Sequence, residues 1–335
     1  MGETYKSSGV DIHAGEDLVS RIKGKVKSTH SPAVLTNIGG FGGLFELDWK
    51  GYENPVLVSS VDGVGTKIMV AILYDKHHTV GQDLVNHCVN DILTCGAKPL
   101  FFMDYFACGK LEVPVAEKVI EGISIACKEN NTSLIGGETA EMPGIYKIGD
   151  YDLAGSITGV VEKGRILDKK NVEPGDLLIG LPSNGLHTNG YSLARKVLLS
   201  QFKISQHVEE LGQTIGEELL RVHRSYLNIT LPLLDKNLVH AISHITGGGI
   251  QGNTSRVIPE DCALHIDTQS WEIPPIFQLI QEQGKVPEQD MREAFNMGIG
   301  LIYIVAKKNA DAVMEYLKKQ NEKAIMIGEI IKNKG

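Results

Sequence analysis

The sequence predicts an α/β (α+β) protein of two domains. Its 335 residues are enough for two domains of about 150 residues each. Short apolar runs alternate with helical periods along the chain, a pattern typical of sheets covered by helices. The stretch 162–176 between the two halves is charged and rich in turn residues. We therefore predict an N-terminal domain over residues 1–168 and a C-terminal domain over residues 169–335.

The first half opens with a polar stretch of about 30 residues and then alternates strands with helices. The nearly continuous apolar run 55–61 predicts a strand that is covered on both faces. Residues 83–95 predict a helix with one apolar and one polar stripe, and a second helix begins at Pro114. Further strands are predicted at residues 132–135, which lead into the acidic loop 136–144, and at residues 151–161.

The second half begins with a strand-turn-helix unit. A strand is predicted at 177–181, followed by the loop 182–190 and by a helix that begins at Tyr191. A second glycine-rich turn, 246–249, follows a β-like run, and a third, 298–300, leads into a buried strand at 301–305. Loops that join strand ends to helix starts are frequent sites of phosphate binding, so these turns are candidate ligand loops.

Composition excludes several classes of protein. The 33 Lys and Arg residues against 41 Asp and Glu residues give a net charge of −8, so no basic surface for nucleic acid is expected. No run approaches the roughly 18 apolar residues of a membrane span, and the first residues do not resemble a signal peptide. The five cysteines form no C-x-x-C pair, which favours reduced, buried thiols. We expect a cytoplasmic protein without a nucleic-acid or membrane partner.

The segment Asp62-Gly63-Val64-Gly65-Thr66-Lys67 offers the groups that a magnesium-bound polyphosphate needs. It combines a carboxylate for Mg²⁺, two glycines that let backbone amides approach phosphates, a hydroxyl and an ammonium. The alternative is an ordinary turn before a helix. The fingerprints of P-loop and Rossmann nucleotide-binding proteins are missing from the sequence.

The polar stripe of helix 83–95 carries further candidate ligands, namely Asp83, Asn86, His87, Asn90 and Asp91. Asp83 and Asp91 lie about 12 Å apart along the helix axis, too far to chelate one Mg²⁺ at a ligand distance of about 2.1 Å. Each therefore needs a carboxylate from a strand end, for which Asp62, Glu138 and Glu141 are candidates. The alternative is a solvated helix face.

Other residues allow acid, base or phosphate chemistry. Glu138 and Glu141 form a pair of carboxylates that holds a metal or acts as acid and base; the alternative is an exposed acidic turn. His187 either transfers a proton near neutral pH or caps its turn. His240 and His244 have the spacing of a zinc helix but lack its Glu, which disfavours zinc. Candidate donors to a phosphate monoester lie at 183–185, 188–190 and 246–249.

Nine short segments in order along nearly the whole chain resemble one family, phosphoribosylformylglycinamidine cyclo-ligase, also called AIR synthetase. They are residues 5–12, 39–42, 62–67, 89–91, 101–105, 136–144, 187–192, 244–249 and 295–300. The segment at Asp62 alone marks a wider superfamily of ATP-using enzymes, and the segments at Glu138, His187 and Asn296 narrow the resemblance to the cyclo-ligase.

The resemblance implies an N-terminal domain whose sheet completes a barrel across a homodimer, and a C-terminal α/β domain. It also implies an activity of de novo purine synthesis: formylglycinamidine ribonucleotide and ATP give aminoimidazole ribonucleotide, ADP and phosphate through an imidoyl phosphate. The implied cofactors are ATP and magnesium, together with potassium as a monovalent cation.

The resemblance also implies roles for individual residues. Asp91, His187 and Lys67 are assigned to catalysis, and Asp62, Asp91 and Glu138 to magnesium. ATP is assigned to Lys23, Asp62, Gly63, Gly65, Thr66 and Lys67, with the flexible segment 9–15 closing over it. The substrate is assigned to Glu141, His187, Thr188, Asn189, Thr246, Gly247, Gly248 and Gly249.

Two alternatives of other kinds remain. A kinase of the same fold, such as a thiamine-monophosphate kinase or a selenide dikinase, would transfer the phosphoryl group to its final product. Selenide enzymes place a Cys or selenocysteine in the N-terminal glycine-rich segment, whereas the first cysteine here is Cys88. A non-catalytic nucleotide-binding scaffold would have lost an acidic ligand or Lys67, and neither is lost.

Overall fold

The computed structural model describes residues 9–333. The chain divides into two compact units: the first contains the residues up to Ile92 together with Pro99–Glu162, and the second contains Leu93–Lys98 and the residues from Lys163 onward. Half of the first segment that resembles the family, residues 5–8 of 5–12, lies outside the described residues.

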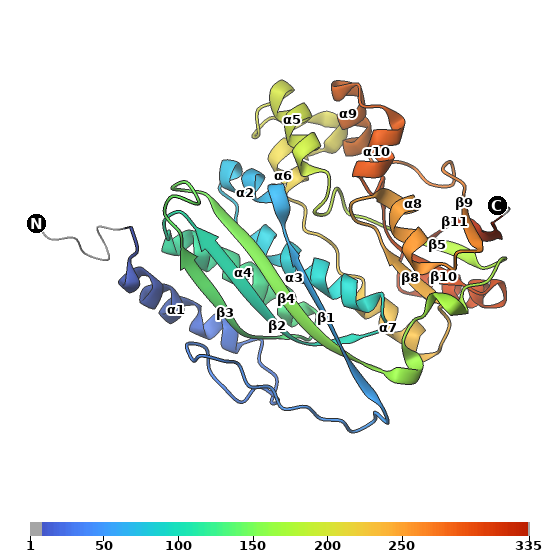
Figure 1. Cartoon of the computed structure of the whole chain (residues 1–335). Helices are drawn as coiled ribbons and strands as arrows, with labels where there is room; N and C mark the ends of the chain where they lie inside the picture. Colours follow the sequence, from blue (N-terminus) through green and yellow to red (C-terminus); the bar gives the residue numbers. More distant parts are fainter. Residues whose placement is uncertain (1–8, 334–335) are drawn as a thin grey trace, which may run out of the picture. The chain divides into compact units, whose positions relative to one another are not determined.

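The first unit is built on a four-stranded sheet with the strand order β1-β4-β2-β3 (Figure 1). β1 pairs antiparallel with β4, whereas β2 and β3 run parallel. The strands are β1 (Pro55–Gly63), β2 (Lys98–Cys108), β3 (Ser133–Glu141) and β4 (Tyr151–Glu162). The parallel pair and the ends of β1 and β3 place several of the expected site residues at the edges of this sheet.

Helices cover one face of this sheet. They are α1 (Ile12–Lys27), α2 (Ile68–Tyr74), α3 (His78–Leu93) and α4 (Val113–Glu129). α3 and α4 approach closely because glycines lie at their contact: a Cβ on Gly81 would stand 2.1 Å from the Val119 carbonyl oxygen. Figure 1 shows the two helices behind the strands, where Leu84, Phe102 and Ile123 form the core.

The first unit confirms several predicted elements and corrects others. The strands at 55–61 and 151–161 and the helix at 83–95 are present, each somewhat longer than predicted. β1 is not covered on both faces, because Leu57 and Val61 on its outer face are 52% and 69% exposed. The prediction of an acidic loop at residues 136–144 is wrong for its first part, because β3 continues to Glu141 through parallel pairing with β2. The polar opening contains α1, so only part of the expected flexible segment 9–15 is loop.

The second unit contains a five-stranded sheet with the order β8-β10-β5-β11-β9, in which neighbouring strands run antiparallel. β10 is buried at every position, which explains the apolar run predicted at 301–305. The strands are β5 (Leu177–Pro182), β8 (Ala241–His244), β9 (Cys262–Ile266), β10 (Ile299–Val305) and β11 (Ile325–Lys332), with a small hairpin of β6 (His207–Val208) and β7 (Gln213–Thr214).

Helices of the second unit pack with the five-stranded sheet and with one another, α5 on α9 and α8 on α10. They are α5 (Tyr191–Gln201), α6 (Ile215–Leu219), α7 (Leu227–Asp235), α8 (Gly249–Thr254), α9 (Pro275–Gly284), α10 (Glu288–Ala294) and α11 (Ala310–Lys319). The predicted strands at 177–181 and 301–305 and the helix at Tyr191 are confirmed.

The five cysteines are free thiols, and all but Cys95 are buried, as the sequence predicts. Burial raises the pKa of the Cys108 thiol to about 11, which keeps it protonated at neutral pH. In the part of the chain that the structure describes, no helix is both long enough and apolar enough to cross a membrane.

Candidate functional site

Two carboxylates and a histidine meet at the end of β1 in the first unit. The Nε2 atom of His87 lies 2.8 Å from Asp62 Oδ2 and 3.8 Å from Asp91 Oδ2. Asp62 comes from β1, while His87 and Asp91 lie one turn apart on α3. The hydroxyl of Ser60 donates to Asp91 Oδ2 at 3.2 Å. The structure therefore brings together Asp62 and Asp91, two of the three expected magnesium ligands.

The charge of His87 depends on this cluster. Burial alone would lower the pKa of the imidazole, but the hydrogen bond to Asp62 and the negative charges of Asp91, Asp62 and Asp83 outweigh it, so that the pKa is raised. The two carboxylates keep part of their surface exposed, whereas the His87 ring is 6% exposed. The arrangement is a partly open pair of hard oxygen ligands that contact a buried histidine.

The loop after β1, predicted to bind polyphosphate, keeps only some of the exposed groups that this binding needs. Gly65 and Thr66 are exposed, and Gly65 has a φ of +63° that favours glycine. Lys67 is different: its side chain is wholly buried, and its Nζ lies 2.8 Å from Asp83 Oδ2 and 2.9 Å from Oδ1. Burial lowers the pKa of Lys67 although Asp83 opposes that effect. This ion pair fixes the loop to α3, and the ammonium is not on the surface where a phosphate would bind.

The polar stripe of α3 is neither a ligand face nor a solvated face over most of its length. Asp83, Asn86, His87 and Asn90 are all buried, and only Asp91 is partly exposed. Partners from other elements satisfy these groups: Lys67 pairs with Asp83, and Asn130 donates to Asn86 at 2.8 Å. The stripe therefore ties α3 into the unit and leaves one carboxylate for a ligand.

Glu138 and Glu141 have separate functions. Glu138 lies exposed on β3, the opposite edge strand from β1, so three strand spacings, about 14 Å, separate it laterally from Asp62. It cannot share one Mg²⁺ with Asp62 in this unit. Glu141 accepts backbone N–H bonds from Asp11 at 2.6 Å and from Leu111 at 2.7 Å. Both of its oxygens hold loops in place, which does not favour the expected contact with the substrate.

Asp104 is a titratable group for which the sequence predicted no role. It lies on β2 between Phe102 and Phe106, and because residues two apart point to the same face of a strand, all three lie on the face that the helices cover. Burial raises the pKa of its carboxyl to about 7, although the residue keeps some exposed surface. Gly137 on β3 leaves room for it, since a Cβ there would stand 2.3 Å from Asp104 Oδ1. In the described range no cationic side chain pairs with this carboxyl.

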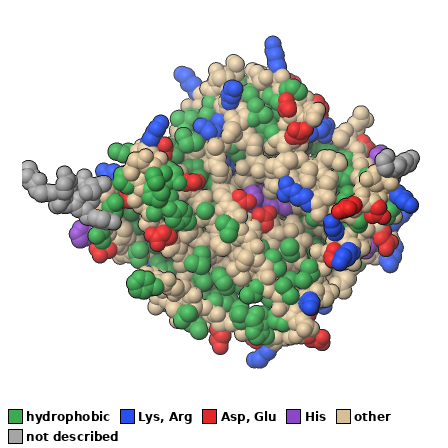
Figure 2. All heavy atoms as spheres, viewed as in Figure 1, with side chains coloured by type: hydrophobic (Ala, Val, Ile, Leu, Met, Phe, Trp, Pro, Cys, Tyr) green, Lys and Arg blue, Asp and Glu red, His purple; other side chains and the backbone are tan. Residues whose placement is uncertain are grey.

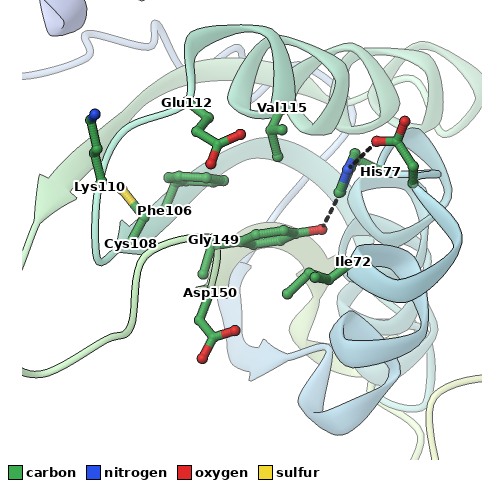
Figure 3. A pocket seen from close by; sticks show the side chains of 11 residues that line it. Ile72, His77, Phe106, Cys108, Lys110, Glu112, Val115, Gly149 and Asp150 are labelled. Atoms are coloured by element: carbon green, nitrogen blue, oxygen red, sulfur yellow. Dashed lines mark hydrogen bonds and ion pairs between the residues drawn. The ribbon is translucent and has the colours of Figure 1, made fainter.

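A cavity of about 180 Å³ lies in the first unit, between α2, the start of α4, the end of β2 and the start of β4 (Figure 3). His77 lines the cavity and contacts two other lining residues: Nδ1 is 3.0 Å from the Tyr151 hydroxyl, and Nε2 is 3.2 Å from Asp75 Oδ1. Burial lowers the pKa of His77 more than Asp75 raises it. These bonds anchor the turn before α3 to β4, and none of the expected site residues lines the cavity.

In the second unit, Asn296 shapes the loop between β5 and α5. Its Oδ1 accepts from the Ser183 hydroxyl at 2.9 Å, and its Nδ2 donates to the Gly185 carbonyl at 3.0 Å. His187 in this loop has a φ of +61°, a left-handed conformation that is strained for a residue with a side chain. Buried polar bonds over-determine the loop, as is common where strain is kept at a binding site.

Asn253 performs the same task for the glycine turn after β8. Its Nδ2 donates to the carbonyls of Thr246, Gly247 and Gly249 at 3.2, 3.2 and 2.8 Å, and its Oδ1 accepts from the Thr246 hydroxyl at 3.0 Å. The amides of Gly248 and Gly249 donate to protein carbonyls. Among residues 9–333, none accepts from the exposed Gly247 amide.

An unsatisfied donor lies beside this turn. The Nδ2 atom of Asn189 is buried without a hydrogen-bond partner in the described residues. A Cβ added to Gly247 would stand 3.4 Å from Asn189 Oδ1, so the two residues are neighbours. A buried amide left without an acceptor costs about 1–3 kcal/mol. The buried Asn189 Nδ2 and the exposed Gly247 N–H are therefore two donors that a ligand with acceptor atoms can contact.

Three histidines stand behind these loops. The rings of His187 and His223 stack with centroids 4.1 Å apart, and His223 Nε2 lies 3.0 Å from His244 Nε2. The other nitrogen of His223, Nδ1, lies 3.2 Å from the Thr188 hydroxyl. All four side chains are buried. The sequence predicted roles for His187 and Thr188 but none for His223.

Comparisons with known proteins agree over both units. Residues 47–161 match the model of the AIR synthase related protein N-terminal domain, and residues 173–335 match that of its C-terminal domain. The phosphoribosylformylglycinamidine cyclo-ligase of Alkaliphilus oremlandii is 47% identical over 333 residues, covering 99% of this chain and 98% of the relative. That of Myxococcus xanthus is 50% identical over 337 residues, covering 100% and 98%.

The chain belongs to the phosphoribosylformylglycinamidine cyclo-ligase family. Members of this family are ligases, so the chain is an enzyme. The family assignment agrees with the resemblance found in the sequence segments around Asp62, Glu138, His187 and Asn296.

Solved structures support the fold of this cyclo-ligase family member. A thiamine-monophosphate kinase from Stenotrophomonas maltophilia superposes with a TM-score of 0.69 at 18% identity, covering 95% of this chain and 94% of that one. The hydrogenase maturation protein HypE in complex with ATP gives a TM-score of 0.68 at 17% identity, covering 97% and 89%. At such identities these similarities show the fold alone.

Proposed function

We propose that the protein cyclises formylglycinamidine ribonucleotide to 5-aminoimidazole ribonucleotide with ATP, in de novo purine (IMP) biosynthesis. The observation that carries the proposal is similarity to cyclo-ligases over the full chain at 47–50% identity. The chemistry of the two units supports it: the first offers carboxylates suited to a magnesium-bound polyphosphate, and the second offers neutral donors suited to a phosphate ester.

The reaction needs activation because an amide oxygen is a poor leaving group. The formyl oxygen attacks the γ-phosphorus of ATP, and ADP leaves with the electrons of the broken P–O bond. The ring-forming nitrogen then attacks the carbon of the imidoyl phosphate, and phosphate leaves with the electrons of the C–O bond. Loss of a proton completes the imidazole, and His187 is the proposed acceptor of that proton. Phosphoryl transfer of this kind depends mainly on positioning and electrostatics.

Asp62 and Asp91 are the proposed magnesium ligands. Their oxygens are hard ligands, both lie within 4 Å of His87 Nε2, and both are partly exposed, a donor set that fits Mg²⁺. Magnesium would neutralise charge on the polyphosphate. Gly63, Gly65 and Thr66 are the proposed phosphate contacts, and the exposed Lys23 on α1 is the proposed further cation for ATP. Glu138, on the far edge strand, would serve a separate contact to the polyphosphate or a second ion.

Lys67 and Glu141 are proposed to act indirectly. The ion pair of Lys67 with Asp83 holds the loop that carries Gly65 and Thr66. The hydrogen bond that Glu141 accepts from the Asp11 amide holds the start of α1 to β3, and the one that it accepts from the Leu111 amide holds the loop before α4. These contacts replace the phosphate contact and the substrate contact expected from the resemblance.

Thr188, Asn189 and Gly247 are the proposed core of the substrate site. Asn189 and Gly247 supply the two donors that await an acceptor, and a phosphate group has several acceptor oxygens. Thr246, Gly248 and Gly249 then shape the turn, because their own polar groups are bonded to the protein. His187 lies in the same loop as Thr188 and Asn189.

A homodimer is proposed from the uncovered face of the four-stranded sheet. Leu57, Val61, Met103 and Tyr105 on this face are between 38% and 69% exposed. Figure 2 shows hydrophobic side chains gathered over it. A second copy would bury this face, since large exposed apolar patches mark association sites. The proposed domains remain 1–168, which dimerises, and 169–335.

Charge on that face should therefore break the dimer. Met103→Glu places a carboxylate among the exposed apolar side chains, so we expect a monomer in sedimentation equilibrium where the unmodified protein is a dimer. Leu35→Glu changes an apolar residue outside the sheet that is more exposed, 60% against 40% for Met103, and should leave the mass unchanged. A monomeric unmodified protein would refute the dimer.

The function is tested by following ADP and the aminoimidazole product in one reaction with magnesium and potassium present, with and without formylglycinamidine ribonucleotide. We expect ADP formation that depends on this substrate and matches the imidazole one to one. ADP without imidazole would point to a kinase of the same fold, and no response to the substrate would refute the proposal.

A further inference from the structure

The cavity of the first unit contains none of the residues proposed to bind ATP or substrate (Figure 3). Its volume of about 180 Å³ is close to the roughly 150 Å³ of an engineered protein cavity that holds one benzene molecule. Phe106 and Tyr151 form an aromatic wall, since their rings stack with centroids 5.2 Å apart and their side chains are 2% and 6% exposed. The cavity therefore has room for a ligand of about five or six heavy atoms and an apolar wall to pack against it.

The hydrogen bonds of His77 determine what the Tyr151 oxygen can offer a ligand. Burial lowers the pKa of His77, so the neutral ring carries one proton. A carboxylate only accepts hydrogen bonds, so this proton is on Nε2, which lies 3.2 Å from Asp75 Oδ1. The bare Nδ1 then accepts from the Tyr151 hydroxyl at 3.0 Å. The hydroxyl proton is thereby committed to His77, and the oxygen of Tyr151 has only lone pairs left for a ligand.

Glu112 adds a carboxylate to the same cavity. It is the N-cap residue of α4, but its side chain does not cap that helix. Within the described part of the chain, no basic side chain forms an ion pair with it. Figure 3 shows the carboxylate turned toward the ring of Phe106, whereas the amino group of Lys110 is turned away from the cavity. The negative charge of Glu112 is therefore left for a ligand to neutralise.

The other charges around the cavity favour a cation as well. Three carboxylates line it, those of Asp75, Glu112 and Asp150. Lys110 is the one lysine or arginine among the lining residues, all of which lie in the described range. Asp75 is also the C-cap residue of α2, where the backbone carbonyls form the negative end of the helix dipole. An anionic ligand would meet more negative than positive charge here.

We propose that this cavity binds a small free aliphatic amine of about five or six heavy atoms. Its ammonium group donates three hydrogen bonds and accepts none, which suits the oxygens of Glu112 and Tyr151. Aromatic rings attract cations, and the carbon chain packs against Phe106, Ile72 and Val115. A neutral ligand would leave the charge of Glu112 unmatched, and an inorganic cation would leave the apolar wall without a contact.

Isothermal titration calorimetry with three ligands of one chain length tests the charge preference. The ligands are butylamine, butan-1-ol and butanoate, added to the whole protein in a buffer that contains potassium. We expect butylamine to bind with a Kd of about 1 mM, which is within reach of a ligand of this size. The alcohol and the carboxylate should bind at least tenfold more weakly. Equal binding of the alcohol, or tighter binding of butanoate, would overturn the proposal.

Two variants locate the binding in this cavity. Glu112→Gln removes the charge at an exposed position, and we expect the Kd for butylamine to rise about tenfold, the effect of one charge-assisted bond. Val115→Phe fills the cavity and should abolish binding. Glu121→Gln, at an exposed position on the same helix, is the matched control and should bind butylamine as the unmodified protein does. Circular dichroism checks that each variant is folded. Unchanged binding in Glu112→Gln or in Val115→Phe would overturn the proposal.

A free amine and a lysine side chain share the same butylammonium group. Nα-acetyllysine N-methylamide presents this group on a peptide backbone, and we expect it to bind more weakly than butylamine because the cavity has no room for the backbone. Tighter binding of the lysine derivative would overturn the assignment to a free amine. These binding measurements do not depend on cyclisation, so the site and the proposed function can fail independently.

Discussion

The two units build their candidate sites from different interactions. In the first, carboxylates dominate: Asp83 pairs with Lys67, and Asp62 bonds to His87. In the second, neutral bonds from Asn253, Asn296 and the histidines hold the loops. Buried charges are costly unless paired, whereas neutral amides fix a loop at lower cost. The difference matches the proposed ligands, a metal-bound polyphosphate for the first unit and a phosphate ester held by N–H and O–H donors for the second.

The largest effect is expected at the buried ion pair. Lys67→Met leaves the carboxylate of Asp83 buried without its cation, which should lower the free energy of unfolding by about 3–5 kcal/mol. The double substitution Lys67→Met with Asp83→Leu should recover most of that loss, because neither charge remains. Denaturant titration measures both. If Lys67→Met costs less than about 1 kcal/mol, as an exposed pair would, the pair is not a structural anchor.

Asp104 should make stability depend on pH. Its pKa is raised to about 7 in the folded protein from 3.8 in the unfolded chain, so the folded state holds the proton more tightly. Stability from this group is present at low pH and is lost as the pH rises from about 4 to 7. Asp104→Asn mimics the protonated carboxyl, so its stability advantage over the unmodified protein should grow by about 2 kcal/mol between pH 5 and pH 8.

Unfolding curves at the two pH values test this expectation. An advantage of Asp104→Asn that is equal at pH 5 and pH 8 would show that the Asp104 carboxyl is ionised in the folded state at both.

Asp91 should matter for turnover more than for stability. Asp91→Asn keeps an acceptor for the Ser60 hydroxyl but removes a charge from the proposed magnesium site, so kcat should fall by well over tenfold, about 1.4 kcal/mol or more. Circular dichroism and the unfolding midpoint should stay close to those of the unmodified protein. Asp290→Asn, at an exposed position of α10, is the matched control. Unchanged turnover in Asp91→Asn would remove Asp91 from the site.

A smaller effect is expected at the glycine turn. Asn253→Ala removes the donor that holds three carbonyls of the turn, so the substrate KM should rise about tenfold while the KM for ATP stays unchanged. Gln251→Ala, on the exposed side of the same helix, should alter neither constant. Equal changes in both variants would show that Asn253 does not shape the substrate loop.

Part of the candidate site in the first unit could be predicted from the sequence. The apolar run that ends at Asp62 and the polar stripe that carries Asp91 made Asp62 one of three candidate partners for Asp91, because both patterns are local. The pairing of Lys67 with Asp83 was not predictable in this way. A polar stripe has the same sequence pattern whether water or a distant side chain satisfies it, and Asn130, the partner of Asn86, lies 44 residues along the chain.

The same reasoning explains the other differences. The segment 136–141 is rich in glycine and glutamate and was therefore predicted as a loop, but tertiary pairing with β2 overrides that local preference. His223 carries no motif, since its partners Thr188 and His244 lie 35 and 21 residues away. The loops themselves were predictable from glycines and polar residues, whereas the side chains that hold them were not.

The central claim is that the two units divide the labour, with polyphosphate in the first and substrate phosphate in the second. The most direct measurement is the pair of KM values, for ATP at several magnesium concentrations and for formylglycinamidine ribonucleotide, in Asp91→Asn and Thr188→Val. We predict that Asp91→Asn changes kcat and the magnesium and ATP dependence alone, and that Thr188→Val changes the substrate KM alone. If both variants shift both constants alike, the division is contradicted.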